Sequence, residues 1–269
     1  MTDFFDIQRF GRLLRAHWAE SWREYAWFAG VLAILDLVIM VVMVALDVEH
    51  RNDQFTYNAQ SFWYFTGLWC SAPIFTWRYF KYLQNPGACL IGLMRPASVF
   101  EKWLMAFLVI GLLYPLAYSL LYVILHYPAV QLAKAVVANM PVCEHCDRDF
   151  RFFFPFLTSG STTGDDHSFL FHTYSFLLLS FSQALVAGGA VYFRRSPVLR
   201  TALVTFFLGT LTLLTGIVPQ AGIFMRNWRY TEAYVHRPVE YVLSFGLWLG
   251  VPVLLWGALY FHIREREVA

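Results

Sequence analysis

Charged side chains are scarce in this 269-residue sequence, and their scarcity excludes a soluble globular protein. Asp, Glu, Lys and Arg make up 14% of the residues and hydrophobic residues make up 58%, whereas soluble domains carry about 25% charged residues. Several apolar runs reach the length of roughly 20 residues that a helix needs to cross a bilayer. The composition therefore predicts an all-α polytopic membrane protein.

The sequence also lacks the short motifs of the common enzyme classes. It contains no Gly-x-x-x-x-Gly-Lys-Ser/Thr phosphate-binding loop, no His-Glu-x-x-His zinc pair and no Gly-x-Ser-x-Gly nucleophile turn. An intramembrane enzyme is disfavoured because chemistry at the membrane midplane usually needs a cluster of polar groups, and Asp36 stands nearly alone. We therefore expect this chain to contain no catalytic residue and to bind no cofactor itself.

Cysteine is rare as well. The four cysteines are too few for a disulfide scaffold. Cys70 and Cys89 are expected to be isolated thiols, whereas Cys143 and Cys146 form a Cys-x-x-Cys pair. Too few regularly spaced ligands accompany this pair for the four-coordinate site that structural zinc needs. The alternatives, in decreasing order, are a disulfide on an oxidising face of the membrane, free thiols and a metal site.

The pattern of apolar residues divides the chain into an interfacial helix and six membrane spans. In residues 1–24, large apolar side chains recur at three- and four-residue steps with arginines between them, which is typical of an amphipathic helix lying in the membrane interface. Pro115 is expected to kink the third span. The six spans are expected at about 26–46, 59–77, 103–125, 168–193, 199–218 and 240–263.

Lysine and arginine are distributed unequally between the two sides of the membrane. One side carries 13 of the 20, in residues 1–24, 78–102, 194–200 and 263–269. The side richer in these residues faces the cytoplasm in most membrane proteins. Both termini and the loop 84–102 are therefore expected in the cytoplasm, with segment 127–167 outside. The whole chain, 1–269, is expected to form a single transmembrane domain.

A few polar residues interrupt the predicted spans. Asp36 lies near the middle of the first span, where a carboxylate costs roughly 2.5–3.5 kcal/mol on insertion scales, so it should face protein or water. Its role is either a hydrogen bond to a neighbouring helix or a place on a substrate pathway. Thr205 and Thr212 in the fifth span suit a packed helix interface or that pathway. His172 and Gln183 in the fourth span are expected to face the interior of the bundle.

The loop 84–102 carries several signals between the second and third spans. It begins with Gln-Asn-Pro-Gly, a strong helix breaker. Residues 88–94 are apolar enough to form a short helix against the membrane surface. Ser98 and Glu101 have the spacing of a capping box, which predicts that the third helix starts there. The loop is interpreted as a docking surface for a partner, and the alternative is an ordinary capped connection.

Two stretches of the chain resemble bacterial permeases of type-2 ABC transporters. They are Met94-Arg-Pro-Ala-Ser-Val-Phe-Glu-Lys-Trp-Leu104 and Gly188-Gly-Ala-Val-Tyr-Phe-Arg-Arg-Ser-Pro-Val-Leu-Arg-Thr201. The order of an interfacial helix, six spans, cytoplasmic termini and a docking loop after the second span is also similar to the membrane subunit of that family. The long segment 127–167 departs from the most compact members, which have short loops at that place.

The resemblance implies a permease subunit of an ATP-driven exporter in the bacterial cytoplasmic membrane. Such a subunit works as a dimer with a second copy or a similar chain, and binds a separate ATPase that holds ATP and magnesium. Nucleic acid is not an expected partner. The alternative is a non-transporting membrane sensor or assembly factor that uses segment 127–167. The residues expected to contact the ATPase are Asn85, Pro86, Gly87, Leu90, Leu93 and Arg95.

Overall fold

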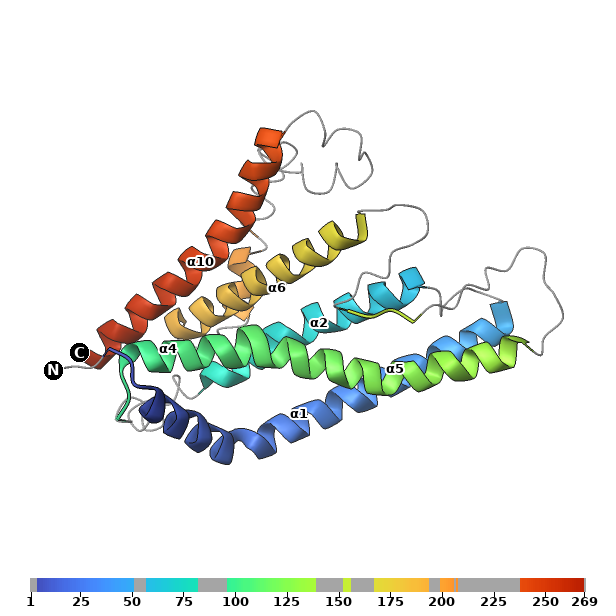
Figure 1. Ribbon diagram of the computed structural model, residues 1–269, viewed down its shortest axis with the longest axis horizontal. Coiled ribbons are helices and arrows are strands. Elements are labelled where there is room, and N and C mark those ends of the chain that lie inside the picture. Colours follow the sequence, from blue (N-terminus) through green and yellow to red (C-terminus); the bar gives the residue numbers. More distant parts are fainter. Residues whose placement is uncertain are drawn as a thin grey trace. The chain divides into compact units, whose positions relative to one another are not determined.

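The protein is all-helical wherever its structure is described. The computed structural model describes residues 4–50, 57–81, 96–138, 152–155, 167–193, 199–205, 207 and 238–268. All regular secondary structure in these ranges is helical, which confirms the predicted all-α class (Figure 1). The chain divides into two compact units. The first comprises Ile7–Ser71 and Leu112–Ser159, and the second comprises Met1–Asp6, Ala72–Gly111 and Gly160–Ala269.

The interfacial helix and the first span, expected as separate elements, form one continuous helix. Helix α1 runs over Ile7–His50, and no break separates residues 1–24 from the span expected at 26–46. The residues at the junction, from Ser21 to Ala26, include neither proline nor glycine, so nothing in them stops a helix. Figure 1 shows that α1 changes direction within its first half. The two segments expected as separate helices are thus joined by a bend within α1, without a gap in the helix.

The third predicted span begins as expected but extends further. Helix α4 (Val99–Phe107) continues through the π-helix η2 (Leu108–Leu113) into α5 (Tyr114–Ala138). The π-helix ends directly before Tyr114 and Pro115, and proline cannot donate the hydrogen bond that a regular helix needs there. Pro115 was expected to kink the helix, and the structure has a π-helical segment directly before it. Residues 127–138, assigned above to the extracytoplasmic segment, belong to α5.

Two further predicted spans are single helices of the second unit. Helix α6 covers His167–Tyr192 and α10 covers Pro238–Val268. Helix α10 packs against α4, where the indole N–H of Trp103 donates to the carbonyl of Trp256 at 2.8 Å. The ring of Phe107 also meets the ring of Trp256 edge-on, with centroids 5.2 Å apart. The half-buried Trp103 thus finds both apolar area and a polar partner at this helix contact.

Gln183 lies in the interior, as predicted. Its side chain on α6 is buried and donates to the carbonyl of Ile110 in the π-helix η2 at 3.0 Å. A π-helix shifts the regular pattern of backbone hydrogen bonds, and a side-chain amide from another helix can satisfy a carbonyl at such a place. The side chain of His172 lies outside the described residues.

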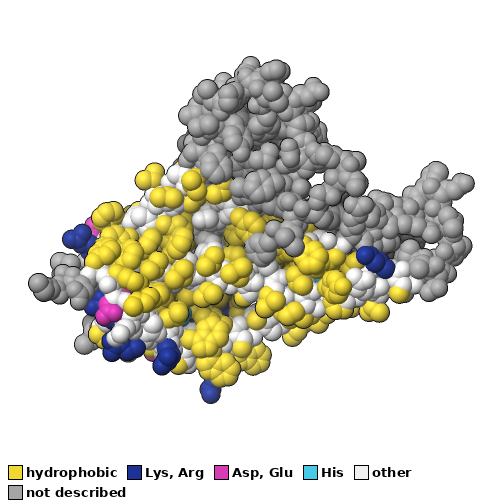
Figure 2. Space-filling view, in the orientation of Figure 1, with side chains coloured by type: hydrophobic (Ala, Val, Ile, Leu, Met, Phe, Trp, Pro, Cys, Tyr) yellow, Lys and Arg dark blue, Asp and Glu magenta, His cyan; other side chains and the backbone are white. Residues whose placement is uncertain are grey.

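The described helices have the length and composition of membrane spans. Within the described ranges, three stretches are long and apolar enough to cross a bilayer, namely Ile7–Val42, Val99–Leu132 and Ser175–Tyr192. Large apolar side chains along α1, such as Trp27, Ile34 and Val41, are exposed. Figure 2 shows hydrophobic side chains over most of the visible surface of the described residues. Such a surface suits lipid rather than water, whereas the number of six spans and the orientation stay predictions.

The orientation can be tested with the native cysteines, because the lysine and arginine distribution places Cys89 inside and both Cys143 and Cys146 outside. These three residues lie outside the described ranges. We expect an impermeant thiol reagent, applied to intact spheroplasts of a Cys70→Ser variant after reduction, to label Cys143 or Cys146 and to spare Cys89. Cys89 should react only after the membrane is permeabilised. Labelling of Cys89 alone in intact cells would require the inverted topology.

Candidate functional site

A line of aromatic and polar side chains follows one face of α5. Tyr114, Tyr118, Tyr122 and His126 are each four residues apart, so they stack along one side of the helix. None of these four residues was among the predicted site residues. The repeated four-residue spacing of Tyr, Tyr, Tyr and His was the signal that could have found them.

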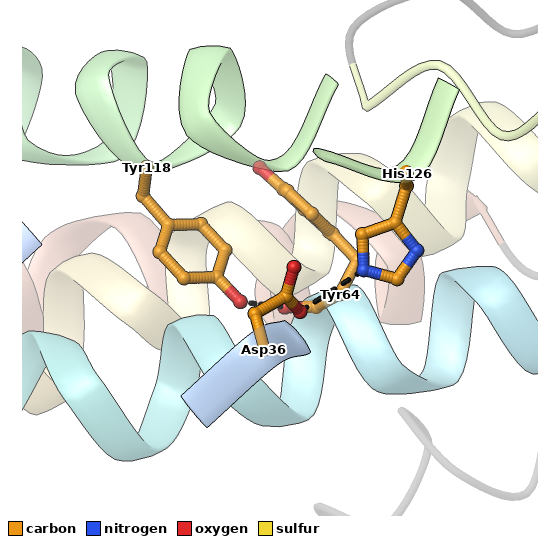
Figure 3. Close-up of polar contacts among 4 residues, drawn as sticks. All are labelled: Asp36, Tyr64, Tyr118 and His126. Atoms are coloured by element: carbon orange, nitrogen blue, oxygen red, sulfur yellow. Dashed lines mark hydrogen bonds and ion pairs between the residues drawn. The ribbon is translucent and has the colours of Figure 1, made fainter. Parts of the chain in front are cut away.

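Asp36 on α1 pairs with His126 on α5. The imidazole Nε2 of His126 lies 3.0 Å from Oδ1 of Asp36, and the two side chains are 9% and 26% exposed. Figure 3 shows Tyr118 and His126 reaching from α5 to either side of the Asp36 carboxylate. Asp36 therefore lies at a contact with a neighbouring helix, as one of the two expected roles requires. Its role in a substrate pathway stays a prediction.

The ring of Tyr122 fixes the orientation of His126. The two rings are stacked with their centroids 4.3 Å apart and their planes 25° from parallel. Tyr122 is itself buried and packs against Phe152 and Phe153. An imidazole held between a stacked ring and a carboxylate has little freedom to turn away. The arrangement thus keeps Nε2 of His126 directed at Asp36.

Hydroxyl groups connect α2 (Tyr57–Phe80) to the same face of α5. The hydroxyl of Tyr114 donates to Oγ of Ser71 at 2.6 Å, and Ser71 donates onward to the carbonyl of Gly67 at 2.6 Å. The hydroxyls of Tyr64 and Ser119 lie 2.7 Å apart. Hydrogen bonds of this kind between helices are worth about 0.6 kcal/mol each in a membrane, with a maximum near 1.7. Their main effect is to fix the register of α2 against α5.

Gly67 provides the space for Tyr118. The hydroxyl of Tyr118 donates to the carbonyl of Tyr64 at 3.3 Å. A Cβ atom at position 67 would collide with the Tyr118 hydroxyl. A side chain at position 67 would therefore displace Tyr118, which lies beside Asp36 in Figure 3. The glycine is thus required by a close approach of two helices.

One short part of segment 127–167 packs into the same unit. Phe153 is fully buried, and its backbone N–H donates to Oε1 of Gln60 on α2 at 3.0 Å. Its ring also meets the rings of Tyr64 and Phe65. Residues 152–155 are therefore anchored to α2 and α5. Cys143 and Cys146, which precede them, lie outside the described residues.

A second polar site lies at the start of α4 and confirms the predicted capping box. Oγ of Ser98 accepts from the N–H of Glu101 at 3.2 Å, and Oε2 of Glu101 accepts from the N–H of Ser98 at 2.9 Å. The other carboxylate oxygen, Oε1, accepts from the N–H of Asp6 at 2.9 Å. Oγ of Ser98 donates to the carbonyl of Phe4 at 2.9 Å. We call this set of contacts the N-terminal clip.

Burial and ring stacking reinforce the N-terminal clip. Glu101 is 0% exposed, and a buried carboxylate is stable only where hydrogen bonds replace its water. The ring of Phe100 stacks on Phe4, with centroids 4.6 Å apart, and meets Phe5 edge-on. Asp6 is followed directly by α1. The clip therefore ties the segment leading into α1 to the first turn of α4, a contact that the local capping pattern did not predict.

Of the remaining predicted site residues, Thr205 is the one that lies in the described part of the chain. Thr205 is exposed and donates to the carbonyl of Thr201 in its own helix at 2.8 Å. In the described part of the fifth span, the buried threonine is Thr201, which lies against Gly189 of α6. Thr201 rather than Thr205 thus makes the helix contact there. Several predicted residues lie outside the described ranges, namely Thr212, Asn85, Pro86, Gly87, Leu90, Leu93 and Arg95.

Within the described ranges, no three His, Cys, Asp or Glu side chains come together as a group that could hold a metal ion. Comparison of the chain with protein-family models, curated proteins and solved structures gives no match. The Asp36–His126 pair and the N-terminal clip each join segments of the described chain that are 90 or more residues apart in the sequence.

The Asp36–His126 pair leads to a prediction about the contact between α1 and α5. Asp36→Leu is expected to insert normally, because the free energy of insertion at the midplane is lower for leucine than for a carboxylate. The substitution removes the carboxylate that is hydrogen-bonded to the imidazole of His126. We expect faster amide hydrogen exchange in α5 around His126, measured by mass spectrometry in detergent. Asp36→Asn should have a smaller effect because its amide oxygen still accepts. Leu35→Ala, at an exposed neighbouring position, is the control, and equal exchange in Asp36→Leu and wild type would contradict the prediction.

Proposed function

We propose that this chain is the permease subunit of an ATP-driven exporter of the type-2 ABC class, acting as a dimer with a separate ATPase on its cytoplasmic side. The single observation that carries the proposal is the N-terminal clip. A permease of this class must convert the motion of a soluble partner into the motion of membrane helices. The coupling element must therefore be joined to those helices by rigid contacts.

The N-terminal clip has the properties that such a coupling element needs. It includes Ser98 and Glu101 at the end of the loop 84–102, which is the expected docking surface. Its central carboxylate, Glu101, is buried and holds two backbone N–H groups, from Ser98 and Asp6. A displacement of the first turn of α4 would thus also pull on the segment that leads into α1. Helix α4 continues through η2 into α5, so the same displacement would reach the third span along its length.

The proposal is tested by purification of the chain from membranes of its native host in a mild detergent. We expect an ATPase subunit with a phosphate-binding loop to co-purify, and its ATP hydrolysis in lipid nanodiscs to depend on the presence of this chain. An unrelated tagged membrane protein from the same host is the control. An ATPase that never co-purifies, or that hydrolyses ATP at the same rate without this chain, would contradict the proposal.

A second function, a non-transporting membrane sensor or assembly factor, is favoured by the packing of Phe153. Phe153 anchors this segment to α2 and α5. A conformational change caused by a ligand that binds the segment could therefore be transmitted to those helices. In that case, replacement of residues 139–151 by a short linker would abolish the response. No ATPase would co-purify with the chain in that case, which distinguishes this function from the first one.

A further inference from the structure

We propose that Asp36 and His126 form a proton-binding site within the membrane-spanning helices, where the pair reversibly takes up one proton. The site is separate from the N-terminal clip and does not rest on the proposed function, since it needs neither an ATPase nor a transported substrate. It lies wholly within the first unit, between α1 and α5, and its ligand is the proton itself.

The first argument is the composition of the pair. A carboxylate and an imidazole lie 3.0 Å apart on helices whose remaining exposed side chains are largely apolar. Ionisable residues inside a membrane are rare because they are costly, and where they occur they commonly mark paths of protons, ions or substrates. Histidine is the side chain whose charge ordinarily changes between about pH 5 and 8. The pair thus combines two side-chain types that carry protons in membrane proteins.

The second argument is the state of the other carboxylate oxygen. Oδ2 of Asp36 is buried and has no hydrogen-bond partner among the described residues. A buried acceptor without a donor is unfavourable, and more so if it carries charge. A proton bound to the carboxyl group removes that charge. The unpartnered oxygen is thus a place where the pair can accept the proton.

The third argument is the balance of charge. With the carboxyl deprotonated and the imidazole neutral, the pair has one negative charge. One added proton makes the pair neutral, either as an ion pair or as two neutral groups, and a second proton makes it positive. Net charge is unfavourable in a medium of low polarity. The neutral, singly protonated pair is therefore preferred, and the titration belongs to the pair rather than to either residue.

Among the described residues, the side chains that surround the pair are phenols rather than charged groups. The titratable groups that face the pair are the phenols of Tyr118 and Tyr122 on α5 and of Tyr64 on α2, which stay neutral at physiological pH. Figure 3 shows that the hydroxyl of Tyr118 lies beside Asp36. Within the described residues, neither member of the pair bonds to a lysine, arginine or glutamate.

The proposal is tested by infrared difference spectroscopy of the full chain in lipid nanodiscs as the pH is varied from about 5 to 8, the range in which histidine ordinarily titrates. We expect a carboxylic-acid C=O stretching band that grows as the pH falls, shifts in D₂O and disappears in Asp36→Asn. In His126→Gln the midpoint of the band should move by at least one pH unit. Glu265→Gln, which removes an exposed carboxylate of α10, should leave the band unchanged.

A second measurement keeps the proposal testable if Asp36→Asn does not fold. The imidazole nitrogens of His126 in the wild-type chain, assigned by comparison with His126→Gln, should change their ¹⁵N chemical shifts over the same pH range. The proposal would be overturned if wild type and Asp36→Asn gave the same infrared spectrum and the ¹⁵N chemical shifts of His126 did not change with pH. Either a band that Asp36→Asn removes or titrating His126 nitrogens would support it.

Discussion

Replacement of Glu101 by alanine should destabilise the protein strongly, because it removes the acceptor of two backbone N–H groups at a fully buried position. Each buried donor left without a partner costs about 1–3 kcal/mol. The expected loss is therefore on the order of 2–4 kcal/mol, which corresponds to an apparent Tm lowered by roughly 5–15 °C. Glu101→Gln should lose less, since the amide retains one acceptor oxygen.

The measurement is thermal unfolding of the detergent-solubilised protein, followed by intrinsic fluorescence. Glu265→Ala is the matched control because Glu265 on α10 is 77% exposed, and exposed substitutions usually change stability by no more than about 0.5 kcal/mol. Ser98→Ala removes the other side chain of the capping box and should give an intermediate loss, typically about 1 kcal/mol. A Glu101→Ala variant that unfolds at the temperature of the wild type would show that the N-terminal clip contributes nothing to the fold.

The second large effect is expected in the loop 84–102, where a partner ATPase would bind. Leu90→Asp or Leu93→Asp should release the ATPase, because buried apolar anchors near the centre of an interface dominate binding. Arg95→Ala should only weaken the complex, since charges at the rim of an interface affect the association rate more than the affinity. These three positions follow from the sequence alone.

The experiment compares the amount of ATPase retained by each variant and its rate of ATP hydrolysis in nanodiscs. Membrane insertion is checked by protease protection, so that a folding defect is not taken for lost binding. Arg95→Ala serves as the comparison variant within the same loop, because it should weaken the complex without releasing the ATPase. If the ATPase remains bound and active with both aspartate variants, the loop 84–102 is not the docking site.

The sequence by itself determined the features that depend on neighbours within a few residues. The helical class follows from long apolar runs, and the bounds of α6, His167–Tyr192, agree closely with the predicted span at 168–193. The capping box of Ser98 and Glu101 was also predictable, because both partners lie in one turn. The missed continuity of α1 has a related cause, since a change of amphipathic pattern does not break a helix that contains no stop signal.

Only the tertiary structure decided which distant residues meet. His126 and Asp36 are 90 residues apart, and Glu101 and Asp6 are 95 apart. Residues so distant come together only when whole helices pack, and that packing depends on the shapes of many side chains at once, such as Gly67 against Tyr118. The sequence therefore identified Asp36 as a carboxylate within a span and Glu101 as a capping residue. The packing of the helices decided that Asp36 meets His126 and that Glu101 accepts a second backbone N–H, that of Asp6.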